Sequence, residues 1–412
     1  MRIALVTGYA TAGSATDTDP RGQALRVATL AKTLVGLGHQ VTVYARKDSP
    51  ARPGSEDAGG VRFEYVPAGP PSALSQDRLL PQLGTFSSEL ARRWAQRPPD
   101  IVHAHFWTSG LAALGATRGT QVPVVQTFHT LGTPRKSVML ADQAIPASQA
   151  TQTAHSEQAE QAEQAEQAAV RNRMERLVAK TVRTVLADSS AELAALTGLG
   201  VPRTAITVVP PGVDTATFEP VGPAARRTKR PRLLAAAPAS ADHGLEMVIQ
   251  ALAALPGAEL MIAGGPPRAE ICTNPVLQDV ARLAERAGVS DRVMFTGKVT
   301  RARIPLLLRS ADLFVHVAGD EATGIQPIEA MACGTAVVAA AGSADQDAVV
   351  DGATGLIVQP GDAKALARRI RQLLASPMLL EGLGIAAADR ARSRYSWDRI
   401  GQETLAAYQR AA

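Results

Sequence analysis

Short runs of aliphatic and β-branched residues alternate with helix-length segments along most of this chain, and that alternation limits the fold more than any other feature. Parallel strands need crossover connections of about helix length, so such an alternation predicts βαβ units. In the first half we expect strands at Arg2–Thr7, Val41–Ala45, Val61–Val66, Ile101–His105 and Val122–Thr127. The sequence therefore predicts an α/β fold with doubly wound, mainly parallel sheets.

The segment between the first two strands has the pattern of a helix. Over Gln23–Leu37, apolar residues recur close to helical spacing, and Gly38 can take the left-handed conformation that closes a helix. A strand, a glycine-containing loop, a helix, a short turn and a second strand make up a doubly wound start.

A second series of strands follows a proline-rich, basic stretch around residues 210–231, which we interpret as a linker. Its strands are expected at Leu233–Ala236, Glu259–Ala263, Val293–Thr296, Leu313–Val317 and Ala336–Ala340. A length of 412 residues suits two domains of about 200 residues each. We expect an N-terminal domain over 1–210, a C-terminal domain over 211–395 and a terminal helical segment over 396–412.

One stretch has low complexity. The triplet Glu-Gln-Ala is repeated from Glu157 to Ala168, and a period of three drifts around a helix without marking an apolar face. Because these residues are strong helix formers, we expect a helical insertion at about 147–170 that runs on through 171–187. A solvated helix is favoured over a coiled coil with a partner.

Composition narrows the class of protein. No apolar run reaches the roughly 18 to 20 residues that cross a bilayer, and the N-terminal stretch predicts a strand, not a signal peptide. Cys272 and Cys333 form no CxxC pair, so we expect a cytoplasmic protein.

The net charge of +5 favours a mixed, arginine-rich surface over a site for anions or membranes. An aromatic content of 4% argues against base stacking. We expect no nucleic-acid partner, no integral membrane contact, and a monomer or homodimer.

The segment most informative about chemistry is GDEATGIQPIEAMACGTAVVAA. A strand leads into a loop with Glu321 and Gly324, and a helix carrying Glu329 follows. A helix N-terminus after a glycine offers free N–H groups and a positive dipole end to an anion. Glu321 could accept hydrogen bonds from sugar hydroxyls, and Glu329 could reach a ribose diol. Taken alone, the two acids would be better interpreted as ordinary surface glutamates on a capped helix.

The whole string resembles family 4 of the retaining glycosyltransferases, which have the GT-B fold. The resemblance rests on Glu321, Gly324, Ile325, Pro327 and the run Glu329–Gly334. In chain order it extends to IVHAHFWTSG, QTFHTLG, VVPPGVDTATF, LMIAGGP, VMFTGKV, VVDGATGLIVQPGD and RYSWDRI, and so covers nearly the whole chain except the insertion. The chain is most similar to actinobacterial members, which include the mycothiol-pathway inositol-phosphate enzyme.

The resemblance implies two Rossmann-like domains facing a donor cleft, with a C-terminal helix that crosses back to the first domain. It implies that Glu321 contacts the transferred sugar, that Glu329 contacts the ribose, and that the Gly324 and Ile325 amides contact the sugar or diphosphate. It also places His129 near the sugar ring, so that the predicted catalytic residues are His129 and Glu321.

Other matching positions complete the predicted site. Gly22 and Gln23 fall where the family has a Gly-Gly loop near the donor phosphates and acceptor. Gly264 and Gly265 follow a predicted strand and suit close approach of the backbone to a nucleotide. His103 and His105 are interpreted as structural residues.

The chain departs from the family at the phosphate-binding cations. Pro238 stands in the position of the family arginine and His243 in that of the lysine. Proline supplies neither charge nor an N–H, and an unperturbed imidazole is mostly neutral at pH 7. Arg21 replaces the first glycine of the Gly-Gly loop and could restore one cation, and Thr323 replaces a phenylalanine.

Three hypotheses follow from the sequence. The first is a retaining hexosyltransferase that moves a sugar from a nucleoside diphosphate sugar to a small hydroxylated acceptor, in specialised metabolism of the antibiotic type. The second is a catalytically impaired relative that acts as a partner or binding protein. The third is a coupling enzyme that uses an unusual nucleophile. We expect no metal site and no cofactor besides the donor substrate.

Overall fold

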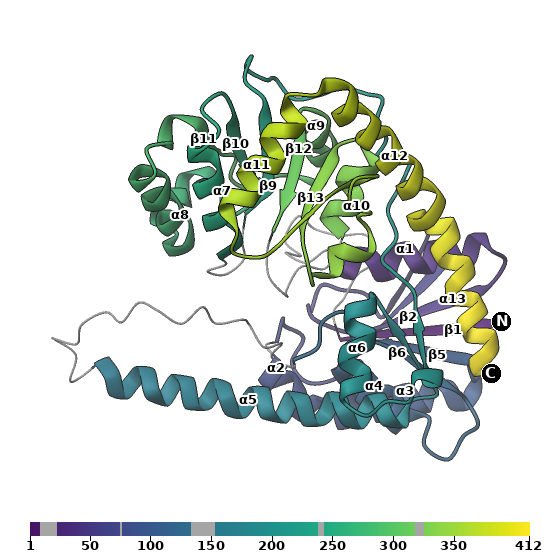
Figure 1. Ribbon diagram of the computed structural model, residues 1–412. Coiled ribbons are helices and arrows are strands. Elements are labelled where there is room, and N and C mark those ends of the chain that lie inside the picture. The colour runs from purple at the N-terminus through teal and green to yellow at the C-terminus, as the bar shows by residue number, and fades with distance from the viewer. Residues whose placement is uncertain (9–22, 75, 133–152, 238–242, 318–324) are drawn as a thin grey trace.

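The computed structural model describes residues 1–8, 23–74, 76–132, 153–237, 243–317 and 325–412. The described strands form two sheets, each the centre of one lobe in Figure 1. The first has the order β3-β4-β2-β1-β5-β6-β7-β8 and the second β11-β10-β9-β12-β13-β14. All described strand pairs are parallel except β3 with β4. The fold class predicted from the sequence, two doubly wound parallel sheets, is confirmed.

The strands of the first sheet are β1 Arg2–Thr7, β2 Gln40–Arg46, β3 Ser55–Ala58, β4 Val61–Val66, β5 Ile101–His105, β6 Val124–Thr127, β7 Thr184–Ala187 and β8 Ile206–Val208. Those of the second are β9 Arg232–Ala236, β10 Glu259–Ala263, β11 Val293–Phe295, β12 Leu313–His316, β13 Ala336–Ala340 and β14 Gly355–Val358. In each sheet the strand order reverses next to the first strand, between β1 and β5 and between β9 and β12. Ligands of open α/β sheets bind at such reversal points, outside the carboxyl ends of the strands.

The helices before residue 200 are α1 Gln23–Gly36, α2 Gln76–Leu79, α3 Leu83–Gln96, α4 Trp107–Ala116, α5 Thr153–Thr181 and α6 Ser190–Gly198. Those after it are α7 His243–Ala253, α8 Pro275–Arg286, α9 Ile304–Arg309, α10 Ile325–Ala332, α11 Ala363–Leu374, α12 Pro377–Tyr395 and α13 Trp397–Ala411. Two single-turn helices, η5 Arg301–Arg303 and η6 Ala344–Asp347, also bear on the site.

The expectation that the insertion helix continues through residue 187 was wrong. α5 ends at Thr181, and the following residues form β7, which pairs in parallel with both β6 and β8. Val185, Leu186 and Ala187 are buried in the sheet. A strand this short has no periodicity of its own, and pairing on both sides overrides the local helix propensity.

The two ends of α5 differ in how far they pack on the rest of the protein. Its last turns pack on α4, with Val178 and Ala179 fully buried. Residues 166–170 are exposed, and the first turns extend away from the first lobe (Figure 1). The helical conformation predicted for the Glu-Gln-Ala repeat is confirmed from residue 153 onward.

α13 crosses back from the second lobe to the first, as the family resemblance implied (Figure 1). Its Ile400, Leu405 and Tyr408 belong to the same buried cluster as Leu34 of α1 and Val43 of β2. The two segments that connect the lobes lie side by side, because the Val213 N–H donates to the Tyr395 carbonyl at 2.7 Å. The C-terminal helix is therefore part of the N-terminal core.

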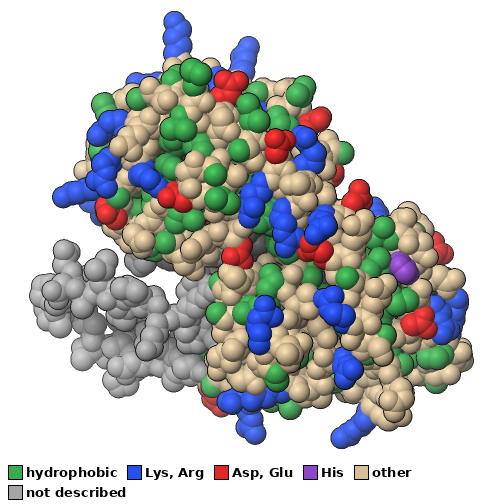
Figure 2. All heavy atoms as spheres, turned by 45° about the vertical axis from the view of Figure 1, so that its right-hand side comes forward, with side chains coloured by type: hydrophobic (Ala, Val, Ile, Leu, Met, Phe, Trp, Pro, Cys, Tyr) green, Lys and Arg blue, Asp and Glu red, His purple; other side chains and the backbone are tan. Residues whose placement is uncertain are grey.

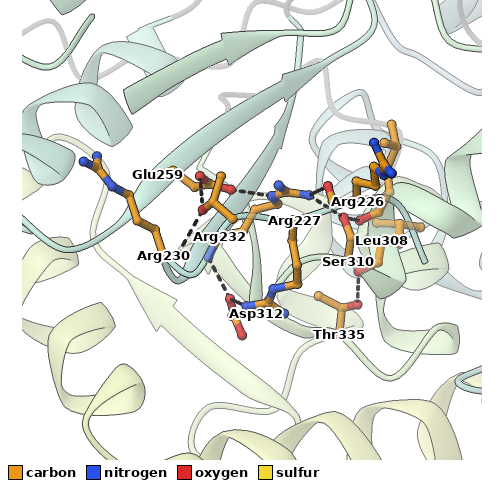
Figure 3. Close-up of polar contacts among 11 residues, drawn as sticks. Arg226, Arg227, Arg230, Arg232, Glu259, Leu308, Ser310, Asp312 and Thr335 are labelled. Atoms are coloured by element: carbon orange, nitrogen blue, oxygen red, sulfur yellow. Dashed lines mark hydrogen bonds and ion pairs between the residues drawn. The ribbon is translucent and has the colours of Figure 1, made fainter. Parts of the chain in front are cut away.

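A buried ion pair fixes the start of the second sheet (Figure 3). Arg232 Nε donates to Glu259 Oε1 at 2.7 Å, and both side chains are almost fully buried. Arg232 Nη1 also donates to Ser310 Oγ, and its backbone N–H donates to Asp312. These bonds join β9 to β10 and to the turn before β12, so the basic stretch ahead of β9 ends in ordered structure.

Within the described ranges, no helix combines the length and the apolar character that crossing a membrane requires. On the face shown in Figure 2, basic and acidic side chains lie interspersed among neutral and apolar ones. No single basic patch dominates that face.

Candidate functional site

The predicted site residues are described to different extents. The side chains of His129 and Glu329 are placed, as is the Gly264–Gly265 pair. Three further residues are described only as the first residues of α1, α7 and α10, namely Gln23, His243 and Ile325. Other positions that the sequence singled out lie outside the described residues: Arg21, Gly22, Pro238, Glu321, Thr323 and Gly324.

His129 follows the carboxyl end of β6 with its imidazole turned into the protein. Its side chain is 3% exposed. The ring Nε2 lies 3.0 Å from His105 Nδ1, and Nδ1 lies 3.6 Å from Asp188 Oδ2. The two imidazoles are stacked, with centroids 5.2 Å apart and planes 14° from parallel.

The backbone at His129 is strained. Outside glycine, the only described residues with a left-handed backbone are Phe106 (φ 70°) and His129 (φ 64°), at the carboxyl ends of the neighbouring strands β5 and β6. Their rings lie 4.8 Å apart. Strained backbone of this kind persists only where surrounding contacts enforce it, and it gathers at functional sites.

Asp188 and Arg26 form an ion pair beside His129. Arg26 Nη2 donates to Asp188 Oδ2 at 2.9 Å, across a sequence separation of 162 residues. Burial alone would raise the pKa of Asp188, but Arg26 and His129 hold it below its ordinary value. Burial, with the neighbouring His103, His129 and Arg26, lowers the pKa of His105 well below the usual range, so this imidazole is neutral.

These polar groups line a small hollow of about 40 Å³. The hollow lies between the ends of β5, β6 and β7 on one side and α1, α13 and the connecting segment Pro210–Gly212 on the other. A space of this size holds a water molecule where two or more polar groups face it. Sequence reasoning missed Arg26 and Asp188, since neither belongs to a recognised motif.

His103 lies deeper in the same network. Its Nδ1 is 2.7 Å from the Tyr408 hydroxyl of α13, and its Nε2 is 2.9 Å from Thr127 Oγ1. Burial lowers the pKa of His103 to about 3. Both ring nitrogens have protein partners, which agrees with the structural role expected for this residue.

The loop after His129 is held by the buried end of α5. Gly132 N–H donates to Glu175 Oε2 at 2.8 Å, and Arg171 donates to the Thr130 carbonyl at 2.8 Å. Arg171 also pairs with Glu175 at 2.6 Å, one helical turn along α5. The spacing of i and i+4 brings this Arg–Glu pair together on one face of the helix, and it is visible in the sequence.

In the second lobe, Glu329 lies on α10 with 2% of its surface exposed. Its Oε1 is 2.5 Å from Arg301 Nη2 on η5. Burial raises the pKa of Glu329, and Arg301 offsets part of that effect. The Arg301 guanidinium lies 4.5 Å from the centre of the Phe218 ring. Arg301 therefore positions the predicted ribose carboxylate, and sequence reasoning missed it.

Gly264 and Gly265 directly follow β10, with φ angles of 100° and 93°. Side chains rarely adopt such angles, so these positions favour glycine. Gly264 N–H donates to Thr296 Oγ1 at 3.0 Å, which fixes the turn. The turn stands at the carboxyl edge of the second sheet, as predicted.

The two lobes meet near these groups. The Ser190 amide and hydroxyl, at the start of α6, each lie 2.5 Å from a carboxylate oxygen of Asp347 on η6. On the same turn, Asp345 Oδ2 lies 2.5 Å from His316 Nδ1, at the end of β12. Among the described residues, no cluster of three or more His, Cys, Asp or Glu side chains could hold a metal ion.

Two family models match the chain, Glycosyltransferase Family 4 over residues 20–217 and Glycosyl transferases group 1 over residues 222–390. A D-inositol 3-phosphate glycosyltransferase of Xylanimonas cellulosilytica is 32% identical, over 95% of this chain and 92% of that protein. The Actinosynnema mirum protein of the same name is also 32% identical, with the same coverage.

Solved structures share the architecture. Sucrose-phosphate synthase from Thermosynechococcus elongatus superimposes with a TM-score of 0.77 at 23% identity, over 99% of this chain and 98% of that one. Anabaena HepE in complex with UDP and glucose gives a TM-score of 0.69 at 18% identity, over 98% of each chain.

Proposed function

The chain belongs to glycosyltransferase family 4 and has the GT-B fold, and on that premise we propose that it transfers a sugar, with retention, from a nucleoside diphosphate sugar to a small hydroxylated acceptor. The relatives' name, D-inositol 3-phosphate glycosyltransferase, supports an acceptor of that kind. The departures at the phosphate site lead us to place the activity in specialised metabolism.

The observation that carries this proposal is the position of Glu329. It is a buried carboxylate on the helix that follows a central strand of the second sheet, held at 2.5 Å by Arg301. A fixed carboxylate is suited to accept hydrogen bonds from the two hydroxyls of a ribose. The Gly264–Gly265 turn stands at the same carboxyl edge of that sheet and allows close approach of a nucleotide. HepE, a structural neighbour, was crystallised with UDP and glucose, which supports a nucleotide-sugar donor here.

The proposed chemistry is substitution at the anomeric carbon with retention. The bond from that carbon to the donor phosphate oxygen breaks, and a bond to the acceptor hydroxyl oxygen forms on the same face. The hydroxyl proton passes to the departing diphosphate, so the reaction balances without a protein base. His129 and Glu321 are proposed to contact the sugar, and the amides of Gly324 and Ile325 the sugar or the diphosphate.

The test is nucleotide affinity, measured by calorimetry with UDP, GDP and dTDP and their sugars. Glu329→Gln keeps the side-chain volume but loses the charge, and Glu329→Ala removes the group. The alanine variant should weaken binding by about 1 to 3 kcal/mol, the cost of leaving a buried hydrogen-bonding group without its partner. Glu285→Ala changes an exposed carboxylate on α8 and is the matched control. Unchanged affinity in a folded Glu329→Ala protein would refute the donor-site assignment.

A second candidate function is donor binding without turnover. It is favoured by the absence of the family's two diphosphate cations at Pro238 and His243. Removing one preorganised group that stabilises developing negative charge costs about 100-fold to 1000-fold in rate. Donor binding together with undetectable transfer to any polyol acceptor would support this alternative.

Restoring the cations tests the predicted diphosphate site, which both candidate functions share. Pro238→Arg with His243→Lys should tighten diphosphate binding, because a fixed positive charge attracts the anion. If His243 is the remaining cation, wild-type affinity should fall as pH rises through the imidazole pKa, and the lysine variant should lose that dependence up to about pH 9. A binding constant that is flat from about pH 5.5 to 8 in both proteins would remove His243 from the site, and Arg21 would be the next residue to test.

A further inference from the structure

We propose that the Arg26–Asp188 ion pair fixes the ring tautomers of His129 and His105 and thereby holds His129 in place, so that Asp188 is a positioning residue for the transfer. This inference rests on the proposed function for the role of His129 beside the sugar. It goes beyond that function because neither Arg26 nor Asp188 was assigned any part in the reaction.

The ring tautomers can be inferred by following the contacts from Arg26 through Asp188 and His129 to His105. Asp188 is ionised and accepts from Arg26 at 2.9 Å, and its Oδ2 lies 3.6 Å from His129 Nδ1, beyond hydrogen-bond distance but close enough for the negative charge to favour a proton on that nitrogen. In a neutral His129 ring this charge places the proton on Nδ1 and leaves Nε2 as an acceptor. At 3.0 Å that nitrogen must receive a proton from His105 Nδ1. The proposed state is therefore a pair of neutral Nδ1–H rings, with His105 donating to His129.

The outer atoms of this hydrogen-bonded network, on His105 and Arg26, agree with the assignment. In the Nδ1–H tautomer, His105 Nε2 has a free lone pair, and among the described residues this buried atom has no hydrogen-bond partner. Arg26 Nη1 is also buried without a described partner, and Arg26 as a whole is 6% exposed. Both residues line the same hollow. A donor and an acceptor on two residues that line a hollow of about 40 Å³ suit a bridging water or hydroxyl group.

The fold over-determines the position of Asp188. It directly follows β7, where its N–H donates to Glu192 Oε2 at 2.6 Å. Ser189 is the N-cap of α6, since its hydroxyl accepts from the Glu192 N–H at 3.1 Å. The carboxylate is thus held by a sheet on one side and a capped helix on the other.

A fixed acceptor matters because His129 has a strained backbone, with φ 64°. That conformation is unfavourable outside glycine and needs contacts that enforce it. The stacked His105 ring and the Asp188 carboxylate hold the imidazole, while Glu175 and Arg171 hold the residues after it. Asp188 brings a carboxylate to within 3.6 Å of the His129 ring.

The test is long-range ¹H–¹⁵N correlation spectroscopy on protein labelled at histidine nitrogen, with signals assigned by replacing each histidine in turn. This readout needs no substrate. In wild type, His129 and His105 should both show the Nδ1–H pattern at neutral pH. Asp188→Ala should turn His129 into a mixture that includes Nε2–H. An Nε2–H or doubly protonated His129 in wild type would overturn the proposal, even if no Asp188 variant folds.

Kinetics then test the positioning role. Asp188→Ala should lower kcat by about tenfold to a hundredfold, as is seen when a partner that orients a metal-ligating histidine is lost. The KM for the donor should change little, and Asp188→Glu should recover part of the loss.

Tyr408→Phe is the matched control, because it removes the hydroxyl that contacts His103 and should leave the His129 tautomer unchanged. An unchanged kcat in Asp188→Ala with altered tautomers would refute the positioning role and leave the proposed function standing. Conversely, a wild-type protein with the expected tautomers but no transfer to any acceptor would count against the proposed function alone.

Discussion

Glu192 shows how burial changes the chemistry of a single carboxyl group. It accepts the Asp188 N–H at 2.6 Å, while its own N–H donates to the N-cap hydroxyl of Ser189 at 3.1 Å. Burial, together with the negative charge of Asp188, raises the pKa of Glu192 to about 8. At neutral pH the group therefore keeps its proton in the folded protein and loses it in the unfolded chain.

This difference predicts how stability depends on pH. Between the unfolded pKa of about 4.3 and the folded value, the native state binds the extra proton, so the free energy of unfolding falls as pH rises. Glu192→Gln keeps an acceptor for the Asp188 N–H but cannot ionise. Chemical denaturation from pH 5 to 8 should therefore give a flatter stability profile for the variant than for wild type. Parallel profiles would show that Glu192 is ionised in the fold.

At the scale of elements, α5 combines a part that the fold needs with a part that it does not. Its last turns bury Val178 and Ala179 against α4 and hold the loop after His129 through Arg171 and Glu175. Residues 166–170 are exposed, and the beginning of the helix extends away from the lobe (Figure 1).

We predict that deleting Glu157–Ala168 leaves the fold intact, because the repeat has no sustained apolar face to bury. The melting temperature should change by no more than a few degrees in calorimetry. Arg171→Ala is the matched comparison in the same helix. It leaves the buried Glu175 carboxylate without its cation and should lower the melting temperature more, since breaking a buried pair is strongly destabilising. A large loss of stability in the deletion would show that the repeat packs on another part of the molecule.

At the scale of the whole molecule, the lobes are joined by the two connecting segments that meet at Val213 and Tyr395. A further contact between the lobes lies outside these segments. The Asp347 carboxylate of η6 accepts from the backbone and the hydroxyl of Ser190, at the N-terminus of α6. An anion at a helix N-terminus is stabilised by the free N–H groups and the helix dipole. This contact favours the lobe arrangement in which it forms.

Asp347→Ala should therefore shift the population toward more open arrangements. Hydrogen bonds to charged groups are worth about 1.5 to 3 kcal/mol when protected, and exposure reduces that value. Small-angle X-ray scattering should show a larger radius of gyration for the variant. Asp351→Ala is the control, because Asp351 pairs with Arg369 within the second lobe. Identical scattering of Asp347→Ala and wild type would mean that this contact does not hold the lobes.

The sequence by itself determined the class of fold and the family. Several strands, such as Arg2–Thr7 and Ala336–Ala340, begin and end where their apolar runs predict. Long buried strands of a parallel sheet are continuous apolar runs, and that pattern is local. The Glu329–Gly334 run is also a local pattern, because all of it lies in one short segment, and it indicated the family.

Only the tertiary structure decided which distant side chains meet. β7 is too short to carry a pattern, and its existence depends on pairing with β6 and β8. The carboxylate that follows it meets Arg26 across 162 residues, and His103 meets Tyr408 across 305. Such contacts depend on how sheets and helices pack, and no local spacing encodes them. The buried network around His129 is therefore a product of the fold, even though the histidine itself stands in a segment that the sequence had singled out.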